Sequence, residues 1–191
     1  MIPSREQAYA LLCRYNQSEA LRKHALAVEG CMRHFAKRAG QDEELWGLAG
    51  LLHDLDYEMY PQEHCAKGAE LLRAEGVDES IVRAMLCHGY GICTDVEPQT
   101  EMEKTLYAVD ELTGLINACA IMRPSKSVMD LELKSVKKKF KQSSFAAGVN
   151  RQIIQDGADR LGMELDTLSN PPVLASRVTY RRQTPWSVCR A

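Results

Sequence analysis

The chain has 191 residues, of which 45% are hydrophobic and 26% are charged, as expected for one soluble globular domain with a hydrophobic core. Its formal net charge of -2 gives no overall field that would favour a nucleic-acid polymer or an acidic membrane as a partner. The longest uncharged apolar run, residues 112–122, is far shorter than the roughly 20 residues of a membrane span. We therefore expect no membrane association.

The seven cysteines contain no Cys-x-x-Cys pair, and several of them have apolar helical neighbours. This pattern predicts reduced, mostly buried thiols in place of a disulfide framework. Residues 1–20 contain no basic region followed by an apolar core, so a signal peptide is not expected. Together these features predict a cytoplasmic protein.

Helical periodicity and cap residues predict a series of helices in the first half of the chain. Ser4 and Gln7 form a capping box for a short first helix. An apolar stripe between residues 21 and 36 predicts a long second helix that Gly40 ends. Asp42 and Asp78 are suited to cap later helices. The predicted helices cover residues 4–12, 16 or 18 to 40, 42–54, 63–76 and 78–88, with a break at 57–61.

The second half continues in the same way after a predicted loop at residues 91–100. Helices are expected at 101–120, from the turn at 123–126 to about 139, and from 143 or 144 to 162. No useful strand alternation and no internal repeat occur. The fold class is therefore predicted as all-α, a compact single-domain helical bundle over residues 1–169. Residues 170–191 contain four arginines and no acid, and are predicted to form an extended basic tail.

Six polar residues interrupt the apolar stripes of these helices. Their burial would cost several kcal/mol unless hydrogen bonds or a metal ion compensated for it. Imidazole and carboxylate groups together favour a divalent ion such as Mn, Fe, Co, Ni, Zn or Mg. No cysteine shares the pattern, which argues against a structural zinc site. The candidate metal ligands are His24, His53, Asp54, His64, His88 and Asp110.

The order of these residues resembles the HD-domain superfamily of metal-dependent phosphohydrolases, which is named after its His-Asp dipeptide. The resemblance covers roughly residues 18–125. Among the branches of the superfamily, the one that hydrolyses dinucleoside polyphosphates is the most similar. The motifs are Leu51-Leu52-His53-Asp54, His64-x-x-x-Gly68-Ala69, Cys87-His88-Gly89 and Glu103-Lys104-x-Leu106-Tyr107-x-x-Asp110.

The resemblance implies a role for each of the six residues. A first ion would be held by His24, His53, Asp54 and Asp110. Asp54 would bridge to a second ion held by His64 and His88. Family members that have only the first four ligands bind one ion, so the two additional histidines predict two ions in this protein. The ions would activate a water that attacks a phosphorus atom, with His53 and Asp54 as the catalytic residues. The implied substrate is a nucleotide or a related small phosphate ester.

One position departs from the family pattern. Many members have a lysine three residues after the aspartate of the dipeptide, whereas this chain has Tyr57, preceded by Asp56. Lys67, one helical turn from His64, is the candidate substitute for this lysine. The resemblance also implies a phosphate-binding cation just past the Asp110 helix, where Arg123 and Lys126 are the candidates. The departure keeps one alternative open, a di-iron oxygenase of the same fold. A further alternative is a non-catalytic protein that binds metal or nucleotide, although the complete ligand set argues against it. The sequence does not predict an oligomeric state.

Two acids near the dipeptide have two interpretations. Asp56 and Glu58 could orient a ligand histidine through its second ring nitrogen. They could equally be exposed loop charges, and the sequence does not decide between these roles.

Overall fold

The computed structural model describes residues 1–169, and this part of the chain is helical without a β-strand. The all-α fold class is therefore confirmed. The predicted basic tail, residues 170–191, lies outside the described residues. The helices are α1 (Arg5–Tyr15), α2 (Glu19–Ala39), α3 (Glu43–Leu52), α4 (Ala66–Ala74), α5 (Glu79–His88), α6 (Glu101–Ile121), α7 (Leu133–Phe140) and α8 (Arg151–Arg160). A further short helical segment covers residues 165–169.

Most helix starts lie where the cap residues predict them. Ser4 and Gln7 form the expected capping box of α1, and Ser18 caps α2. Asp42 accepts hydrogen bonds from two backbone N–H groups in the first turn of α3. Gly40 ends α2 with φ at 65°, a left-handed conformation that glycine adopts without steric cost.

Three predicted helices are wrong in their bounds. The segment between α3 and α4 turns irregularly from residue 53 to 65, so His64 precedes a helix and is not part of one. The predicted helix ending near 139 is confined to α7, and the one predicted from 143 is confined to α8. The irregular stretch before α8 is held by Arg151, whose guanidinium donates to the carbonyls of Phe140 and Val149 at 2.9 and 3.0 Å. These bonds satisfy backbone groups that a helix would otherwise pair.

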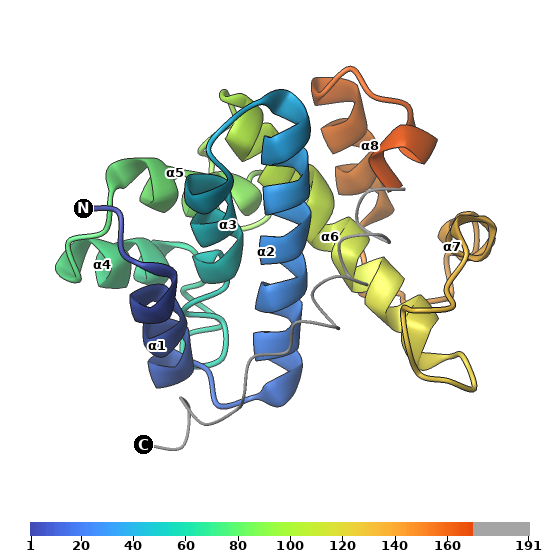
Figure 1. Cartoon of the computed structure of the whole chain (residues 1–191), viewed down its shortest axis with the longest axis horizontal. Helices are drawn as coiled ribbons and strands as arrows, with labels where there is room; N and C mark the ends of the chain where they lie inside the picture. Colours follow the sequence, from blue (N-terminus) through green and yellow to red (C-terminus); the bar gives the residue numbers. More distant parts are fainter. Residues whose placement is uncertain (170–191) are drawn as a thin grey trace.

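The long helix α2 lies at the centre of the molecule, with α3 along one side and α6 packed against it (Figure 1). One hydrophobic cluster joins α2 and α3 to α6 and α8, and a second joins α3 to α1, α4 and α5. Leucines such as Leu51 and Leu112 are fully buried in these clusters, and burial of each stabilises the fold by about 2 kcal/mol. Helix α3 contributes to both clusters, and the His53-Asp54 dipeptide follows it directly.

The remaining composition-based expectations concern thiols and membranes. Cys31, Cys65, Cys87, Cys93 and Cys119 are free thiols, as expected. The expectation of reduced thiols is wrong at Cys13, which is disulfide-bonded. None of the helices within residues 1–169 combines the length and apolar character of a membrane span.

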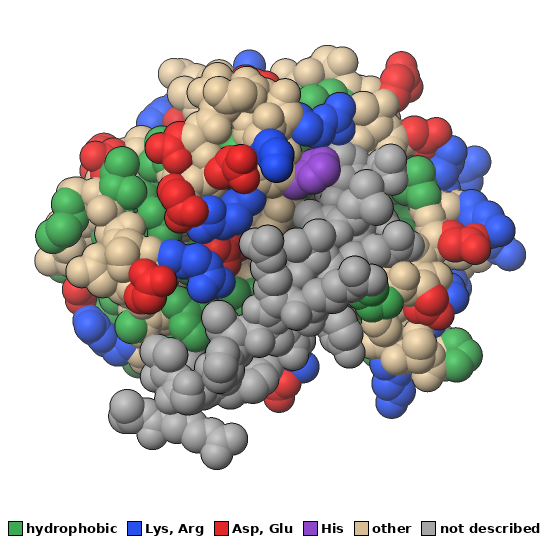
Figure 2. Space-filling model, viewed as in Figure 1, with side chains coloured by type: hydrophobic (Ala, Val, Ile, Leu, Met, Phe, Trp, Pro, Cys, Tyr) green, Lys and Arg blue, Asp and Glu red, His purple; other side chains and the backbone are tan. Residues whose placement is uncertain are grey.

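On the face shown in Figure 2, Lys and Arg side chains are interspersed with Asp and Glu side chains.

Candidate metal centre

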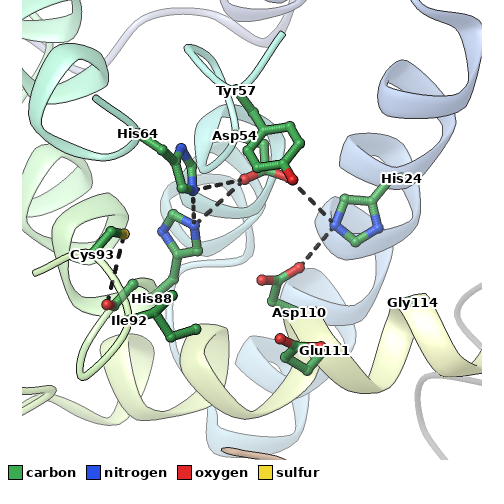
Figure 3. Close-up of a pocket in the computed structure, with 11 residues that line it drawn as sticks. His24, Asp54, Tyr57, His64, His88, Ile92, Cys93, Asp110, Glu111 and Gly114 are labelled. Carbon is green, nitrogen blue, oxygen red and sulfur yellow. Dashed lines mark hydrogen bonds and ion pairs between the residues drawn. The ribbon is translucent and has the colours of Figure 1, made fainter. Parts of the chain in front are cut away.

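The fold brings the six polar residues singled out in the sequence to one place. Figure 3 shows five of them, all except His53. Two come from the middle of long helices, His24 on α2 and Asp110 on α6. The others lie at helix ends or in turns: His53 and Asp54 just after α3, His64 just before α4, and His88 as the last residue of α5.

The carboxylate of Asp54 lies at the centre of the group. Its Oδ2 atom is 3.3 Å from Nε2 of His53 and 3.7 Å from Nε2 of His24. Its Oδ1 atom is 3.5 Å from Nε2 of His64 and 3.5 Å from Nε2 of His88. One carboxylate therefore faces two different sets of imidazoles, one with each oxygen.

Asp110 completes the first set. Its Oδ1 atom is 2.8 Å from Nε2 of His24 and 3.3 Å from Nε2 of His53. One potential ligand atom from each of these three residues lies within 4.8 Å of the others. Together with Oδ2 of Asp54, the first set therefore has two nitrogen and two oxygen atoms that can face one ion.

Helix ends fix the orientation of two of the histidines. The last four carbonyls of an α-helix have no partner within the helix. His53 uses one of them, because its Nδ1 donates to the carbonyl of Gly50 at 2.8 Å. His88 makes the equivalent bond from Nδ1 to the carbonyl of Met85. A carbonyl can only accept, so the neutral rings carry their proton on Nδ1 and present the Nε2 lone pair to the site.

A buried acid orients His64 in the same way. Nδ1 of His64 donates to Oδ1 of Asp56 at 2.8 Å, and Asp56 is fully buried. The other oxygen of Asp56 accepts from the backbone N–H of Gly68 at 2.7 Å. Glu58 behaves differently, because its carboxylate accepts from the backbone N–H of Ser18 at 2.9 Å. Asp56 therefore orients a candidate ligand, whereas the carboxylate of Glu58 contacts the backbone at the start of α2.

Two features of the site fit divalent ions. Nε2 of His53 is buried without a hydrogen-bond partner, which is costly for a polar atom. Nε2 of His64 and Nε2 of His88 are 3.2 Å apart, and with protons on both Nδ1 atoms these are two lone pairs facing each other. A cation at each position would satisfy all three atoms.

The charges of the site perturb its titration strongly in the absence of metal. Burial disfavours the imidazolium of His53, but the carboxylates of Asp54 and Asp110 outweigh it and raise the pKa of this ring above 6.5. Burial also opposes ionisation of both acids, yet the neighbouring imidazoles lower the pKa of Asp54 and of Asp110. The site thus holds its carboxylates ionised, as metal ligands require.

A pocket of about 340 Å³ opens onto this group. Besides five of the candidate ligands, its walls include Tyr57, Ile92, Cys93 and Glu111. The ring of Tyr57 packs edge-on against His64, with centroids 5.0 Å apart. Within residues 1–169, no Lys or Arg lines this pocket. Its side chains are acidic, aromatic or apolar apart from the histidines.

The three predicted phosphate-binding cations are not brought into the pocket. Lys67 pairs with Glu70 at 2.7 Å, and Arg123 pairs with Asp130 at 2.8 Å. Lys126 lies in the turn after α6 with φ at 47°. Their role in phosphate binding stays a prediction.

Sequence reasoning missed several pocket residues. Glu111 directly follows Asp110, so its proximity could have been inferred from the ligand. Ile92 and Cys93 belong to the tight turn after His88, where Gly91 adopts φ of 74°. The expectation that no cysteine shares the ligand pattern is wrong at Cys65, which offers a ligand atom within 4.8 Å of those of His64 and His88. The Sγ atom of Cys65 also lies 3.1 Å from Sγ of Cys93. No spacing in the sequence pairs these two cysteines.

The fold and site define an all-α protein whose clustered histidines and carboxylates can hold divalent ions. Residues 21–115 match the family model described as the HD domain, and this segment contains all six candidate ligands. The chain therefore contains an HD domain, a type of domain that binds divalent metals.

The chain is also similar to a curated protein, the tRNA (cytidine(56)-2'-O)-methyltransferase of Thermoplasma volcanium. The two are 28% identical over 122 residues, which is 63% of this chain and 36% of the methyltransferase. The match thus spans about a third of that relative's length. No solved structure matches the chain significantly.

Proposed function

We propose that this protein is a metal-dependent phosphohydrolase acting on a nucleotide or a related small phosphate ester. The observation that carries the proposal is the position of Asp54, whose two oxygens face two separate sets of imidazoles. A carboxylate in this position is suited to bridge two ions. Two-metal sites of this kind promote displacement at phosphorus.

The distances support two ligand sets. His24, His53 and Asp110 would hold the first ion with Oδ2 of Asp54. His64 and His88 would hold the second ion with Oδ1 of Asp54. When bound, divalent ions lower the pKa of a water molecule and neutralise charge on phosphoryl oxygens. The identity of the ions is left open, because these ligands suit Mn, Fe, Co, Ni, Zn and Mg.

The protein's own side chains orient the ligand histidines and form the pocket wall that a substrate would contact. The bonds from Nδ1 of His53 and His88 to helix-end carbonyls aim both rings at the site before any ligand arrives. Tyr57 and Ile92 present apolar surface at the pocket, where they can contact the organic part of a substrate. Glu111 adds a carboxylate that can accept a hydrogen bond from a sugar hydroxyl or a base amine.

The similarity to a tRNA methyltransferase does not lead us to propose methyl transfer. The matched region covers 36% of that enzyme, and the imidazole and carboxylate groups of the present pocket are suited to ion binding. The match does supply one substrate to test, because the printed name of the relative refers to tRNA. The assignment to the branch that hydrolyses dinucleoside polyphosphates is likewise a proposal to be tested.

A second candidate is a di-iron oxygenase built on the same ligands. Two observations favour it: Tyr57 stands where many phosphohydrolases of the family have a lysine, and no Lys or Arg in residues 1–169 lines the pocket. Iron content together with oxygen consumption would distinguish this reaction. Turnover that is equally fast under strict anaerobiosis would exclude it.

The experiment uses the full chain, stripped with a chelator and reloaded in turn with each of the candidate ions. Phosphomonoesters, phosphodiesters, nucleotides, dinucleoside polyphosphates and tRNA serve as substrates. We expect hydrolysis of one of these substrates that requires metal and is lost in Asp54→Ala, while Glu58→Gln, which changes a nearby acid outside the site, retains it. Absence of turnover with every ion, or activity that persists in Asp54→Ala, would refute the proposal.

A further inference from the structure

A pair of thiols that the proposed hydrolysis does not use lies at the wall of the pocket. Cys93 is exposed and lines the pocket, whereas Cys65 is buried behind it. Their Sγ atoms are 3.1 Å apart. A disulfide bond is about 2.05 Å long, so the sulfurs need to approach by only about 1 Å to form one.

The backbone around the pair keeps the two sulfurs together. Cys65 has φ at 68°, a conformation that is uncommon for residues other than glycine. Gly89 lies against both sulfurs, and a Cβ atom there would be 2.4 Å from Sγ of Cys93 and 2.7 Å from Sγ of Cys65. The close approach therefore depends on the absence of a side chain at residue 89.

We propose that Cys65 and Cys93 form a reversible disulfide when the protein reacts with a hydroperoxide. The exposed sulfur of Cys93 attacks one oxygen of hydrogen peroxide, the O–O bond breaks, and a sulfenic acid and one water result. The sulfur of Cys65 then attacks the sulfur of Cys93, the S–O bond breaks, and a second water leaves. Two thiols lose two protons and two electrons, and the peroxide is reduced to two waters.

The location of the pair links it to one half of the metal centre. Cys65 directly follows His64, and its Sγ atom is 3.9 Å from both ring nitrogens of His88. Cys93 lies in the turn that follows His88, where its backbone N–H donates to the carbonyl of Gly89 at 3.0 Å. A bond between the sulfurs would therefore shift both imidazoles of the second ligand set.

The first ligand set has no such link, because His24 and Asp110 lie on α2 and α6. The consequence, which rests on the proposed function, is that oxidation releases the ion held by His64 and His88 and leaves the ion held by the first set. Bound metal per chain would fall twofold. Reduction by dithiothreitol would restore it.

The thiol chemistry is tested on the reduced, metal-free full chain. After treatment with hydrogen peroxide, remaining thiols are alkylated and the digested protein is analysed by mass spectrometry. We expect a crosslinked peptide joining Cys65 and Cys93 that disappears after dithiothreitol. It should be absent in Cys93→Ser and present in Cys87→Ser, a matched control that removes a buried thiol one residue before His88.

Two outcomes would overturn the disulfide: both thiols alkylate as fully after peroxide as before, or Cys93 proceeds to sulfinic acid without a crosslink. Metal analysis before and after oxidation tests the consequence separately. Unchanged metal content in a crosslinked protein would overturn the link to the second ligand set. Because the crosslink is measured without metal, its result does not depend on whether the proposed hydrolysis occurs.

Discussion

Asp56 is fully buried and accepts a hydrogen bond from Nδ1 of His64 at 2.8 Å, while its second oxygen is occupied by the backbone N–H of Gly68. Such partners set the tautomer and the direction of a ligand histidine. The substitution Asp56→Asn removes the negative charge and one of the two acceptor oxygens. We expect it to weaken metal binding about 10- to 100-fold.

A competition titration with a chromophoric chelator measures this effect. Glu58→Gln is the matched control, because Glu58 is two residues away and its carboxylate contacts the backbone of Ser18. Equal metal affinity of Asp56→Asn and the wild-type protein would show that His64 does not need this partner.

The substitution Tyr57→Lys introduces the lysine that many HD-domain phosphohydrolases have at this position, and it tests the proposed phosphate binding. Tyr57 is 46% exposed, so Tyr57→Lys is expected to leave the core unchanged. A positive charge at the pocket should raise kcat/KM for a phosphate ester about fivefold, which corresponds to about 1 kcal/mol. Tyr57→Met removes the ring without adding charge and serves as the control. If kcat/KM does not rise above that of this control, the missing lysine is not what limits phosphate binding.

The pH dependence of stability follows from the ion pairs of the metal-free site. The pKa of His53 is raised above 6.5, so this ring stabilises the fold below pH 6.5 and the contribution is lost as pH rises through the raised pKa. The pKa of Asp110 is lowered, so its contribution is present above 3.8 and is lost as pH falls. A metal ion needs the neutral ring and therefore competes with protons.

We therefore expect the increase in Tm caused by a divalent ion to be larger at about pH 8 than at about pH 6. Thermal unfolding with and without the ion measures it. His53→Gln, which removes the titrating ring, should abolish most of the difference. An increase in Tm that is independent of pH would mean that the ion does not displace protons from His53.

Close packing between α6 and α8 gives a stability prediction away from the site. A Cβ atom on Gly157 would lie 2.5 Å from Cβ and 2.7 Å from Cα of Ala108. Gly157→Ala should therefore destabilise the fold by about 1–2 kcal/mol, because overpacking outweighs the gain in helix propensity. Gly114→Ala is the matched control: its Cβ would be 3.7 Å from Val149, an ordinary contact. Chemical denaturation should show Gly114→Ala unchanged or more stable by about 0.5–1 kcal/mol.

The sequence was most informative where a local rule decides the structure. Ser4, Ser18, Asp42 and Asp78 cap helices as predicted, because each cap needs only a side chain and the next three residues. The six candidate ligands were found because imidazoles and carboxylates that interrupt an apolar helical pattern are conspicuous in a sequence. Their convergence in space was implied by the family resemblance and could not be obtained from spacing alone.

The sequence was least informative where long-range contacts decide. The turn at 53–65 was predicted as partly helical, yet the buried Asp56 organises it through contacts with His64 and Gly68. Lys67 was predicted at the pocket, but Glu70 lies three residues on, at the spacing at which helix side chains pair. The approach of Cys65 to Cys93 joins two turns far apart in sequence and had no local signal.

The metal content of ligand variants tests most directly whether Asp54 joins two ion sites. The account predicts that the reloaded wild-type chain binds two ions and that His88→Ala and Asp110→Ala each retain one. Asp54→Ala should retain neither ion after gel filtration. Elemental analysis after gel filtration, with circular dichroism to verify folding, gives these numbers. Metal content that is the same in folded Asp54→Ala as in the wild-type protein would contradict the account.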